Sequence, residues 1–253
     1  MATLGKVYLI GAGPGAQDLI TLRGARLLAA ADVVLHDALV TPEMLELCPQ
    51  AEKILVGKRC GQLSTAQQFI NKQLVDNAHK HAIVVRLKGG DPMLFGRADE
   101  ELRALEEAGI DVEVVPGITT ALAAAAATRQ PLTKRGISRS VSFFTSSTAP
   151  ELDGLVTTPN TDTLVQYMGG REAIATAQRL LAQGRRADTP VVVIENCSRP
   201  DQRILRLTLA TLAHGLGPAH GPVLVMLGAA MKQRERQPAD NNKVENTAGP
   251  DRA

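Results

Sequence analysis

The chain has 253 residues, of which 44% are hydrophobic and 21% are charged, so it can bury a sizeable core and is not a disordered protein. Its formal net charge is +2, from 28 Lys and Arg against 26 Asp and Glu, and no general attraction to nucleic acid or to a membrane is expected. Aromatic residues make up only 2%, too few for recognition of bases by stacking, so any anionic partner must be held by a local cluster of charge.

Cysteine and histidine patterns predict neither a disulfide framework nor a metal site. The three cysteines, Cys48, Cys60 and Cys197, are far apart and form no CxxC, and the five histidines form no HExxH-type set. Residues 1–6 lack a signal-peptide pattern, and no apolar run approaches the about 18 residues of a membrane span. We therefore expect a soluble cytoplasmic protein that binds no metal.

Short β-branched segments alternate with helical periodicity in the first half of the chain. Strands are predicted at 6–10, 32–35, 53–56, 81–87 and 111–115, and helices at 18–30, 64–78 and 98–108. Such alternation is typical of a largely parallel sheet with helices on its faces.

A second series of elements follows an Ala-rich helix at 121–127. Its strands are predicted at 140–145, 163–168, 190–195, 204–208 and 222–227, with a helix at 171–183. Two α/β domains account for this length, one over 1–116 and one over 117–231. The tail at 232–253 is polar and without periodicity, and it is predicted to be disordered.

A glycine-rich turn follows the first predicted strand. Residues 11–15 read G-A-G-P-G, and with Ala16 they fit GxGxxA, a variant of the dinucleotide-binding fingerprint. Asp37 lies about 20 residues further on, where an acid that binds ribose would be expected. However, Pro14 removes a backbone N–H from the loop that would hold a pyrophosphate. A nicotinamide-dependent enzyme and a plain turn without ligand both remain open here.

A second candidate loop lies at 84–97, where a buried strand runs into Gly89-Gly90 and then Asp91-Pro92. Paired glycines at the carboxyl end of a strand expose backbone groups to a ligand, and such strand ends are where open α/β sheets bind ligands. Asp91 can accept hydrogen bonds from a ribose or an amine. Basic residues add local positive charge: Arg86, Lys88 and Arg97.

Six motifs occur in order along the chain: G-A-G-P-G at 11–15, R-L-K-G-G-D-P at 86–92, V-P-G-I-T at 115–119, P-L-T-K-R-G at 131–136, Y-M-G at 167–169 and E-N-x-S-R-P-D-Q at 195–202. With these motifs the sequence resembles the tetrapyrrole (corrin/porphyrin) methylase family from about residue 7 to residue 228. Within the family, it is most similar to the members that methylate uroporphyrinogen III. A single motif would be weak, but six in order with this spacing are specific.

The resemblance implies two α/β domains with mainly parallel sheets and S-adenosylmethionine in the cleft between them, released as S-adenosylhomocysteine. It also implies a homodimer. A cofactor without a pyrophosphate explains why Pro14 is tolerated in the first loop. By resemblance, the residues that contact the cofactor are Pro14, Gly89, Gly90, Asp91, Leu94, Thr119, Thr120, Met168 and Cys197.

The implied reaction is methylation of uroporphyrinogen III at C2 and C7, which gives precorrin-2 for sirohaem, cobalamin or haem d1 synthesis. The substrate carries many carboxylates, which Arg binds in bidentate fashion. By resemblance, the substrate contacts are Gly13, Lys58, Arg59, Arg97, Lys134 and Arg135, and the catalytic residues are Asp37, Lys58, Arg97, Glu100 and Met168. Glu100 is expected to orient Arg97, which we interpret first as an anchor because an Arg is a poor base.

The sequence departs from the usual family pattern at four places. Residues 96–101 read G-R-A-D-E-E instead of G-R-G-G-E-E, 145–147 read T-S-S instead of T-G-H, 131–135 read P-L-T-K-R instead of P-L-T-H-R, and 36–37 read H-D instead of Y-D. These changes leave the cofactor residues intact and bear on substrate identity and rate. A methylase of a later corrin intermediate, a nicotinamide-dependent oxidoreductase and a non-catalytic paralogue that binds the cofactor remain as alternatives.

Overall fold

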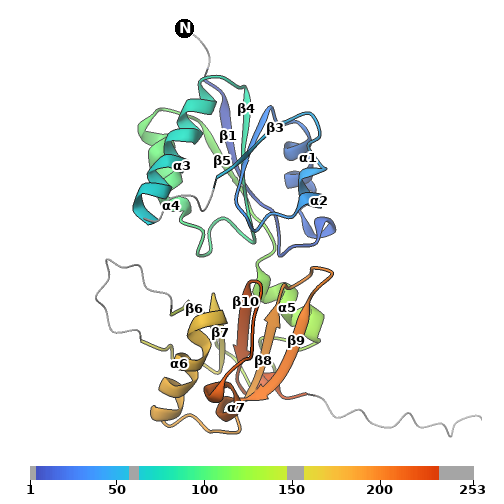
Figure 1. Ribbon diagram of the computed structural model, residues 1–253, viewed down its shortest axis with the longest axis vertical. Helices are drawn as coiled ribbons and strands as arrows, with labels where there is room; N and C mark the ends of the chain where they lie inside the picture. The colour runs from blue at the N-terminus through green and yellow to red at the C-terminus, as the bar shows by residue number, and fades with distance from the viewer. Residues whose placement is uncertain (1–3, 57–62, 147–156, 234–253) are drawn as a thin grey trace, which may run out of the picture.

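A computed structural model describes residues 4–56, 63–146 and 157–233 of the chain. Its elements form two α/β units, each built around its own sheet, and one unit lies above the other in Figure 1. The first sheet contains β1 (Lys6–Gly11), β2 (Val33–His36), β3 (Glu52–Leu55), β4 (Ile83–Lys88) and β5 (Val112–Val115). The strand order is β3-β2-β4-β1-β5, and every pairing in this sheet is parallel, as predicted.

Helices cover both faces of this first sheet (Figure 1). The helices are α1 (Leu22–Ala29), α2 (Pro42–Leu45), α3 (Leu63–Ala78) and α4 (Ala98–Glu107). Alternation along β1 explains the two cores, because Val7 and Leu9 pack with Leu74 and Leu105 of α3 and α4. On the other face, Ile10 belongs to the cluster that includes residues of α1 and α2.

The second sheet contains β6 (Val141–Thr145), β7 (Thr163–Tyr167), β8 (Pro190–Glu195), β9 (Arg203–Thr208) and β10 (Val223–Leu227), in the order β6-β7-β10-β8-β9. Only the β6–β7 pairing is parallel, and the other three are antiparallel. The prediction of mainly parallel pairing is therefore wrong for this sheet. Residues 196–202 join β8 to β9 directly, and so short a connection permits only an antiparallel pair.

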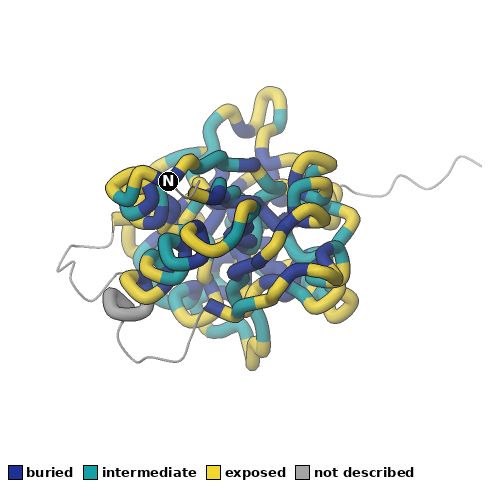
Figure 2. Tube along the Cα trace, turned by 90° about the horizontal axis from the view of Figure 1, so that it is seen from above, coloured by how far each residue is buried: buried dark blue, intermediate teal, exposed yellow. Residues whose placement is uncertain are grey.

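The second sheet is also covered on both faces. On one face, α6 (Gly169–Ala182) and α7 (Leu209–His214) contribute to a buried cluster with β7, β8 and β10. On the other, α5 (Thr120–Thr128) and the 3-10 turn η2 (Ala229–Met231) pack through small side chains. Figure 2 shows the buried residues gathered inside the molecule.

Helix boundaries differ from the predicted ones where capping decides them. The helix predicted at 18–30 is split into a 3-10 turn, η1 (Gln17–Leu19), and α1, because Thr21 accepts a hydrogen bond from the Gly24 N–H at 3.1 Å and caps α1. The short helices α2 and α7 were not predicted, since neither is long enough to show a helical period.

The chain passes from β5 to α5 through residues 116–119, so the predicted boundary between 116 and 117 falls in the connection between the two sheets. The division into two independent domains stays a prediction. Of the predicted tail at 232–253, residues 234–253 lie outside the described part. In the described ranges, no helix is both long and apolar enough to span a membrane, and no cluster of His, Cys, Asp and Glu suited to a metal is found.

Candidate active site

A cleft of about 390 Å³ lies between the two sheets. The carboxyl ends of the parallel strands β1, β2 and β4 form one side, as expected for ligand sites of open α/β sheets. The end of β7, the start of β10 and residues 196–199 form the other side. Most of the predicted site residues line this cleft: Gly13, Pro14, Asp37, Gly89, Gly90, Asp91, Leu94, Arg97, Thr119, Thr120, Met168 and Cys197.

Three loops meet at the glycines of the cleft floor. Gly90 donates its N–H to the Gly13 carbonyl at 2.7 Å, and Gly13 donates back to the Gly90 carbonyl at 3.2 Å. A Cβ on Gly117 would lie 2.3 Å from the Gly90 oxygen, so this contact requires a glycine. At Gly90, which has a φ of 72°, a Cβ would meet no protein atom within 4 Å. The backbone of Gly90 is thus open to a ligand in the cleft.

Asp91 fixes this arrangement. Its carboxylate accepts the Met93 N–H at 2.8 Å and the Gly117 N–H at 2.9 Å. The side chain therefore ties the loop after β4 to the loop after β5 while it also lines the cleft.

The glycine-rich turn does not have the geometry of a dinucleotide site. The fingerprint needs a helix that begins directly at the turn and directs its N-terminus at the pyrophosphate. Here α1 begins only at Leu22, and the Gly13 N–H is bound to Gly90. Asp37, expected to bind ribose in that alternative, accepts the Leu39 N–H at 2.9 Å and the Gly89 N–H at 3.5 Å.

Met168 and Tyr167 stand at the end of β7, on the opposite side of the cleft. Met168 is 51% exposed and has a φ of 54°, so an apolar thioether is held at the surface of the cleft by an uncommon backbone conformation. The centroid of the Tyr167 ring lies 5.1 Å from that of Phe95, a residue of the loop between β4 and α4. Sequence reasoning singled out Met168 but assigned no contact to Tyr167 or Phe95, although both line the cleft.

Cys197 is buried, and this burial raises the pKa of its thiol to about 11. It is therefore a neutral thiol at ordinary pH and no candidate nucleophile. The next two residues of the chain, Ser198 and Arg199, connect the two α/β units. The Ala16 N–H donates to Ser198 Oγ at 3.0 Å, and Arg199 Nη2 donates to the Leu39 carbonyl at 2.8 Å.

Arg97 and Glu100 form the predicted pair. Arg97 Nε donates to Glu100 Oε1 at 2.6 Å and Arg97 Nη2 to Oε2 at 2.7 Å, a bidentate contact that fixes the guanidinium plane. The neighbouring Asp99, which stands where the usual family pattern has a glycine, pairs with Arg103 at 2.6 Å on the exposed side of α4. It does not line the cleft.

A buried charge cluster forms part of the floor and was not predicted as such. Glu101 is fully buried and receives Arg86 Nε at 3.0 Å and Lys88 Nζ at 2.8 Å. Burial and the nearby Arg86 charge lower the pKa of Lys88. From the sequence, Arg86 and Lys88 were interpreted only as local positive charge, because nothing in the spacing shows that Glu101 lies between them.

Residues 6–213 match the family of Tetrapyrrole (Corrin/Porphyrin) Methylases. The chain belongs to this family. It is 46% identical over 229 residues to Siroheme synthase 2 of Yersinia pestis (strain Pestoides F). The matched region covers 89% of this chain and 48% of that protein. It is 44% identical over 245 residues to Siroheme synthase of Pseudomonas fluorescens (strain Pf0-1), with 93% and 52% covered. The chain spans about half the length of these curated relatives.

Solved structures of the family show the same fold. Uroporphyrin-III C-methyl transferase from Thermus thermophilus, complexed with S-adenyl homocysteine, is 37% identical with a TM-score of 0.79, and the match covers 93% of this chain and 98% of that one. A cobalamin biosynthetic enzyme, cobalt precorrin-4 methyltransferase, is 29% identical with a TM-score of 0.76 and coverages of 90% and 96%. Methylases with different named substrates thus share this architecture almost equally.

Four predicted substrate residues are not placed in the cleft. Lys58 and Arg59 lie outside the described residues. Lys134 and Arg135 lie in a turn closed by the Lys134–Ser138 bridge and do not line the cleft. A substrate would contact this pair only by extending beyond the cleft, so both assignments stay predictions.

Two of the departures from the family pattern have a structural setting. Ser146, in the T-S-S segment, is buried and shares hydrogen bonds with Gln166 and Thr176 at 3.2 and 3.0 Å. At the H-D position, His36 contacts the Asp37 carbonyl through Nδ1 at 3.2 Å.

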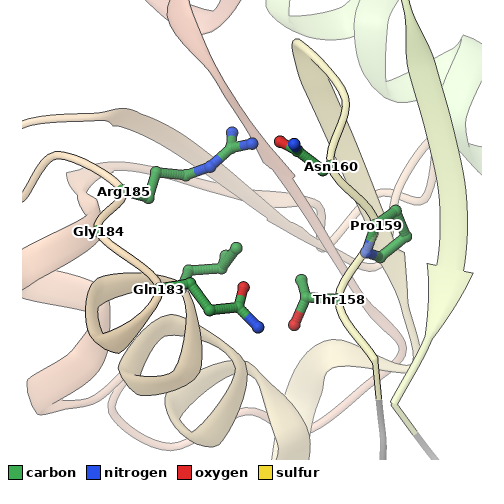
Figure 3. Close-up of a pocket in the computed structure, with 7 residues that line it drawn as sticks. Thr158, Pro159, Asn160, Gln183, Gly184 and Arg185 are labelled. Carbon is green, nitrogen blue, oxygen red and sulfur yellow. The ribbon is translucent and has the colours of Figure 1, made fainter.

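A second hollow, of about 430 Å³, lies at the far end of α6. Figure 3 shows Gln183 and Arg185 at the end of this helix facing Thr158 and Asn160. None of the predicted site residues lines it, and Thr158 follows closely on residues 147–156, which are not described. We assign it no function.

Proposed function

We propose that the chain methylates uroporphyrinogen III at C2 and C7 with S-adenosylmethionine, giving precorrin-2. The observation that carries this proposal is that the Gly89-Gly90 backbone, the exposed Met168 and Arg97, which is paired with Glu100, line one cleft. It is supported by the likeness to uroporphyrin-III C-methyl transferase over nearly the whole length of both chains.

The residues of the cleft fit the cofactor. A Cβ at Gly90 would occupy open cleft space, so bare backbone is available where a nucleoside or amino acid group would lie. Met168 offers an apolar, polarizable sulfur to the sulfonium end, and Asp91 keeps lone pairs beyond its two backbone bonds. When bound, S-adenosylmethionine supplies an electrophilic methyl group for attack by a carbon nucleophile.

The chain's own residues act by holding the two reactants in line and excluding water, which supply most of the rate of such transfers. Arg97, held by Glu100, binds a substrate carboxylate and so sets the position of the macrocycle. Phe95 and Tyr167 give the cleft an apolar wall next to Met168. An electron-rich pyrrole is itself a nucleophile, so the protein needs no covalent residue.

The proposal includes a homodimer, as the family resemblance implies, and a cytoplasmic location. Light scattering after size-exclusion chromatography measures the mass of the particle. A monomer mass would contradict the dimer without touching the proposed reaction.

The reaction is tested by anaerobic incubation with uroporphyrinogen III and S-adenosylmethionine, followed by mass spectrometry of the tetrapyrrole. We expect a gain of two methyl groups. Cofactor binding in a calorimeter with no mass gain would overturn the proposal in favour of a later corrin substrate or a non-catalytic paralogue. Binding of a nicotinamide cofactor without S-adenosylmethionine would overturn it altogether.

A further inference from the structure

The cleft floor contains more positive than negative charge in a place shielded from water. Glu101 is the one carboxylate between two cations, Arg86 and Lys88, and relative exposure is 0% for Glu101 and 4% for each cation. Gln67 also donates to Glu101, at 3.4 Å. A buried charge that lacks its own counter-ion is expensive, so this cluster has a reason to lose a proton.

Lys88 is the member of the cluster that can lose that proton. A guanidinium stays charged at any pH a protein tolerates, and Arg86 is further bound to the Leu35 and Leu87 carbonyls at 3.4 and 3.1 Å. An ammonium can become a neutral amine, and burial together with Arg86 lowers the pKa of Lys88. The cluster is then neutral overall, with one Lys88 N–H still on Glu101.

The surroundings place the Lys88 amine beside the reaction space. Lys88 itself lines the cleft, next to Gly89 and Gly90. A Cβ at Gly96 would lie 3.2 Å from Lys88 Cε, so the glycine of this loop leaves room for the lysine stem. The charged groups that face the amine are Glu101 from α4, Arg86 from β4 and Asp37 from the loop after β2.

We propose that Lys88, as a neutral amine, is the proton acceptor of the methylation. The inference rests on the proposed function and extends it. Once a pyrrole carbon has formed its bond to the methyl group, the ring is cationic and carries an N–H. The C=N bond of this cation has already formed from the nitrogen lone pair. When the N–H proton passes to the Lys88 lone pair, the N–H bonding pair stays on the ring nitrogen as a lone pair and the ring becomes a neutral imine. The resulting ammonium is stabilised by Glu101, and its proton later returns to solvent.

Other titratable side chains that line the described cleft are less suited. The Tyr167 hydroxyl and the Cys197 thiol have raised pKa values because both are buried. Arg97 is a poor base and is already bound to Glu100. Asp91, which also lines the cleft, is assigned to the cofactor by resemblance. Asp37 remains as the rival acceptor, since it lines the same cleft and its carboxylate accepts the Leu39 and Gly89 N–H groups.

Four variants separate the two acceptors. Lys88→Met removes the amine and leaves Arg86 and Glu101 as a balanced ion pair. Lys88→Arg keeps the positive charge but cannot act as a base. Asp37→Asn removes the carboxylate of the alternative proton acceptor. We expect both Lys88 variants to lose about 10²- to 10⁴-fold in kcat, the usual share of general-base catalysis, with unchanged KM for the tetrapyrrole. In Lys88→Ala, added ethylamine should restore part of kcat.

A measurement on the free protein gives an independent readout. Because the pKa of Lys88 is lowered from 10.5, the unfolded chain binds more protons than the folded one between the lowered value and 10.5. The unfolding free energy of the wild type should therefore rise with pH across that interval. The same plot for Lys88→Met should lack this rise.

The outcomes are distinct. If the wild type gives no methylated product, the proposed function fails and the role of Lys88 with it. If the wild type methylates but Lys88→Arg retains full kcat, Lys88 is not the acceptor. The same conclusion follows if ethylamine does not restore kcat in Lys88→Ala while Asp37→Asn abolishes proton removal. Calorimetric binding of S-adenosylmethionine to each variant shows that a loss of kcat is not a loss of the fold.

Discussion

The Tyr167 hydroxyl lies 2.6 Å from the Thr119 hydroxyl and accepts the Ala121 N–H at 3.2 Å. Thr119 is the N-cap residue of α5, yet its own side chain makes no capping hydrogen bond. A tyrosine at the end of β7 thus satisfies an N–H of the first turn of α5. Both ends of this contact line the cleft, so the helix start and the cleft wall share one support.

Tyr167→Phe removes this support and keeps the ring. We expect the loss of a helix cap and a hydrogen bond to lower the unfolding free energy by about 1 kcal/mol. S-adenosylmethionine should bind more weakly, because Thr119 and Thr120 lose their fixed position. Urea unfolding and calorimetry measure the two effects, and Tyr8→Phe, at a position of β1 that does not line the cleft, is the control. Equal cofactor affinity in Tyr167→Phe and wild type would contradict the assignment of Thr119 and Thr120.

Gly90 and Gly117 form a matched pair for testing the cleft floor. Gly117→Ala places a Cβ 2.3 Å from the Gly90 oxygen, and we expect overpacking to cost about 3 kcal/mol of stability. Gly90→Ala meets no atom within 4 Å and should cost only the about 1–2 kcal/mol of a left-handed non-glycine residue.

Gly90→Ala, the variant with the smaller loss of stability, should show the larger direct loss of cofactor affinity. Because the new Cβ of Gly90→Ala enters the cleft, this variant should remain folded and lose cofactor affinity. Thermal unfolding and calorimetry on both proteins decide the matter. A Gly90→Ala protein that binds S-adenosylmethionine normally would show that the cofactor does not approach this backbone.

Arg97 is expected to act on the substrate and not on the cofactor. Arg97→Ala should lower kcat/KM for the tetrapyrrole by on the order of 100-fold, as expected when a charged hydrogen-bonded contact worth about 3 kcal/mol is lost. Glu100→Gln should show a smaller loss of the same kind, since it loosens the guanidinium. Steady-state kinetics and cofactor calorimetry separate the two effects.

Arg103→Ala is the matched control for this pair. Arg103 forms an exposed ion pair on the same helix but does not line the cleft, and its removal should leave the kinetics unchanged. Full activity in Arg97→Ala would remove that residue from the mechanism.

The Cys197 thiol should titrate late. Since burial raises its pKa to about 11, the rate of alkylation by iodoacetamide should keep rising about tenfold per pH unit between pH 7 and 9.5. Mass spectrometry of the peptide that contains Cys197 measures the rate, and the unfolded chain serves as a control with an ordinary thiol. A rate that levels off near pH 9 in the folded protein would show that the thiol is not buried as described.

The first sheet could be predicted almost fully because its strands alternate with helices, and because its central strands β1, β2 and β4 are largely buried and stand out as apolar runs. The strands of the second sheet could also be predicted, but their pairing direction could not, because β10 inserts between β7 and β8, and the apolar run of Val223–Leu227 fits a parallel or an antiparallel neighbour equally well. Only the order of connections decides this, and that order is a property of tertiary packing.

The candidate site shows a similar division. Loop residues with motif character, such as Gly90, Asp91 and Met168, were found from the sequence and meet in one cleft. Lys88 was seen only as a charge, because its burial depends on Glu101 reaching it from a later helix. Lys134 and Arg135 have the right chemistry for an anionic substrate, but their turn holds them away from the cleft.

The central place of β1 bears on how the chain folds. Its partners are β4 and β5, with Lys6 opposite Ile83 and Val7 opposite Val112, so the middle of the first sheet forms only after long loops have closed. In the second sheet, Glu195 pairs with Arg203 across a short turn, a local contact that closes quickly. We therefore expect the β8–β9 pair to gain structure in refolding before the β1–β4 pair and before the β7–β10 pair, which also joins distant segments.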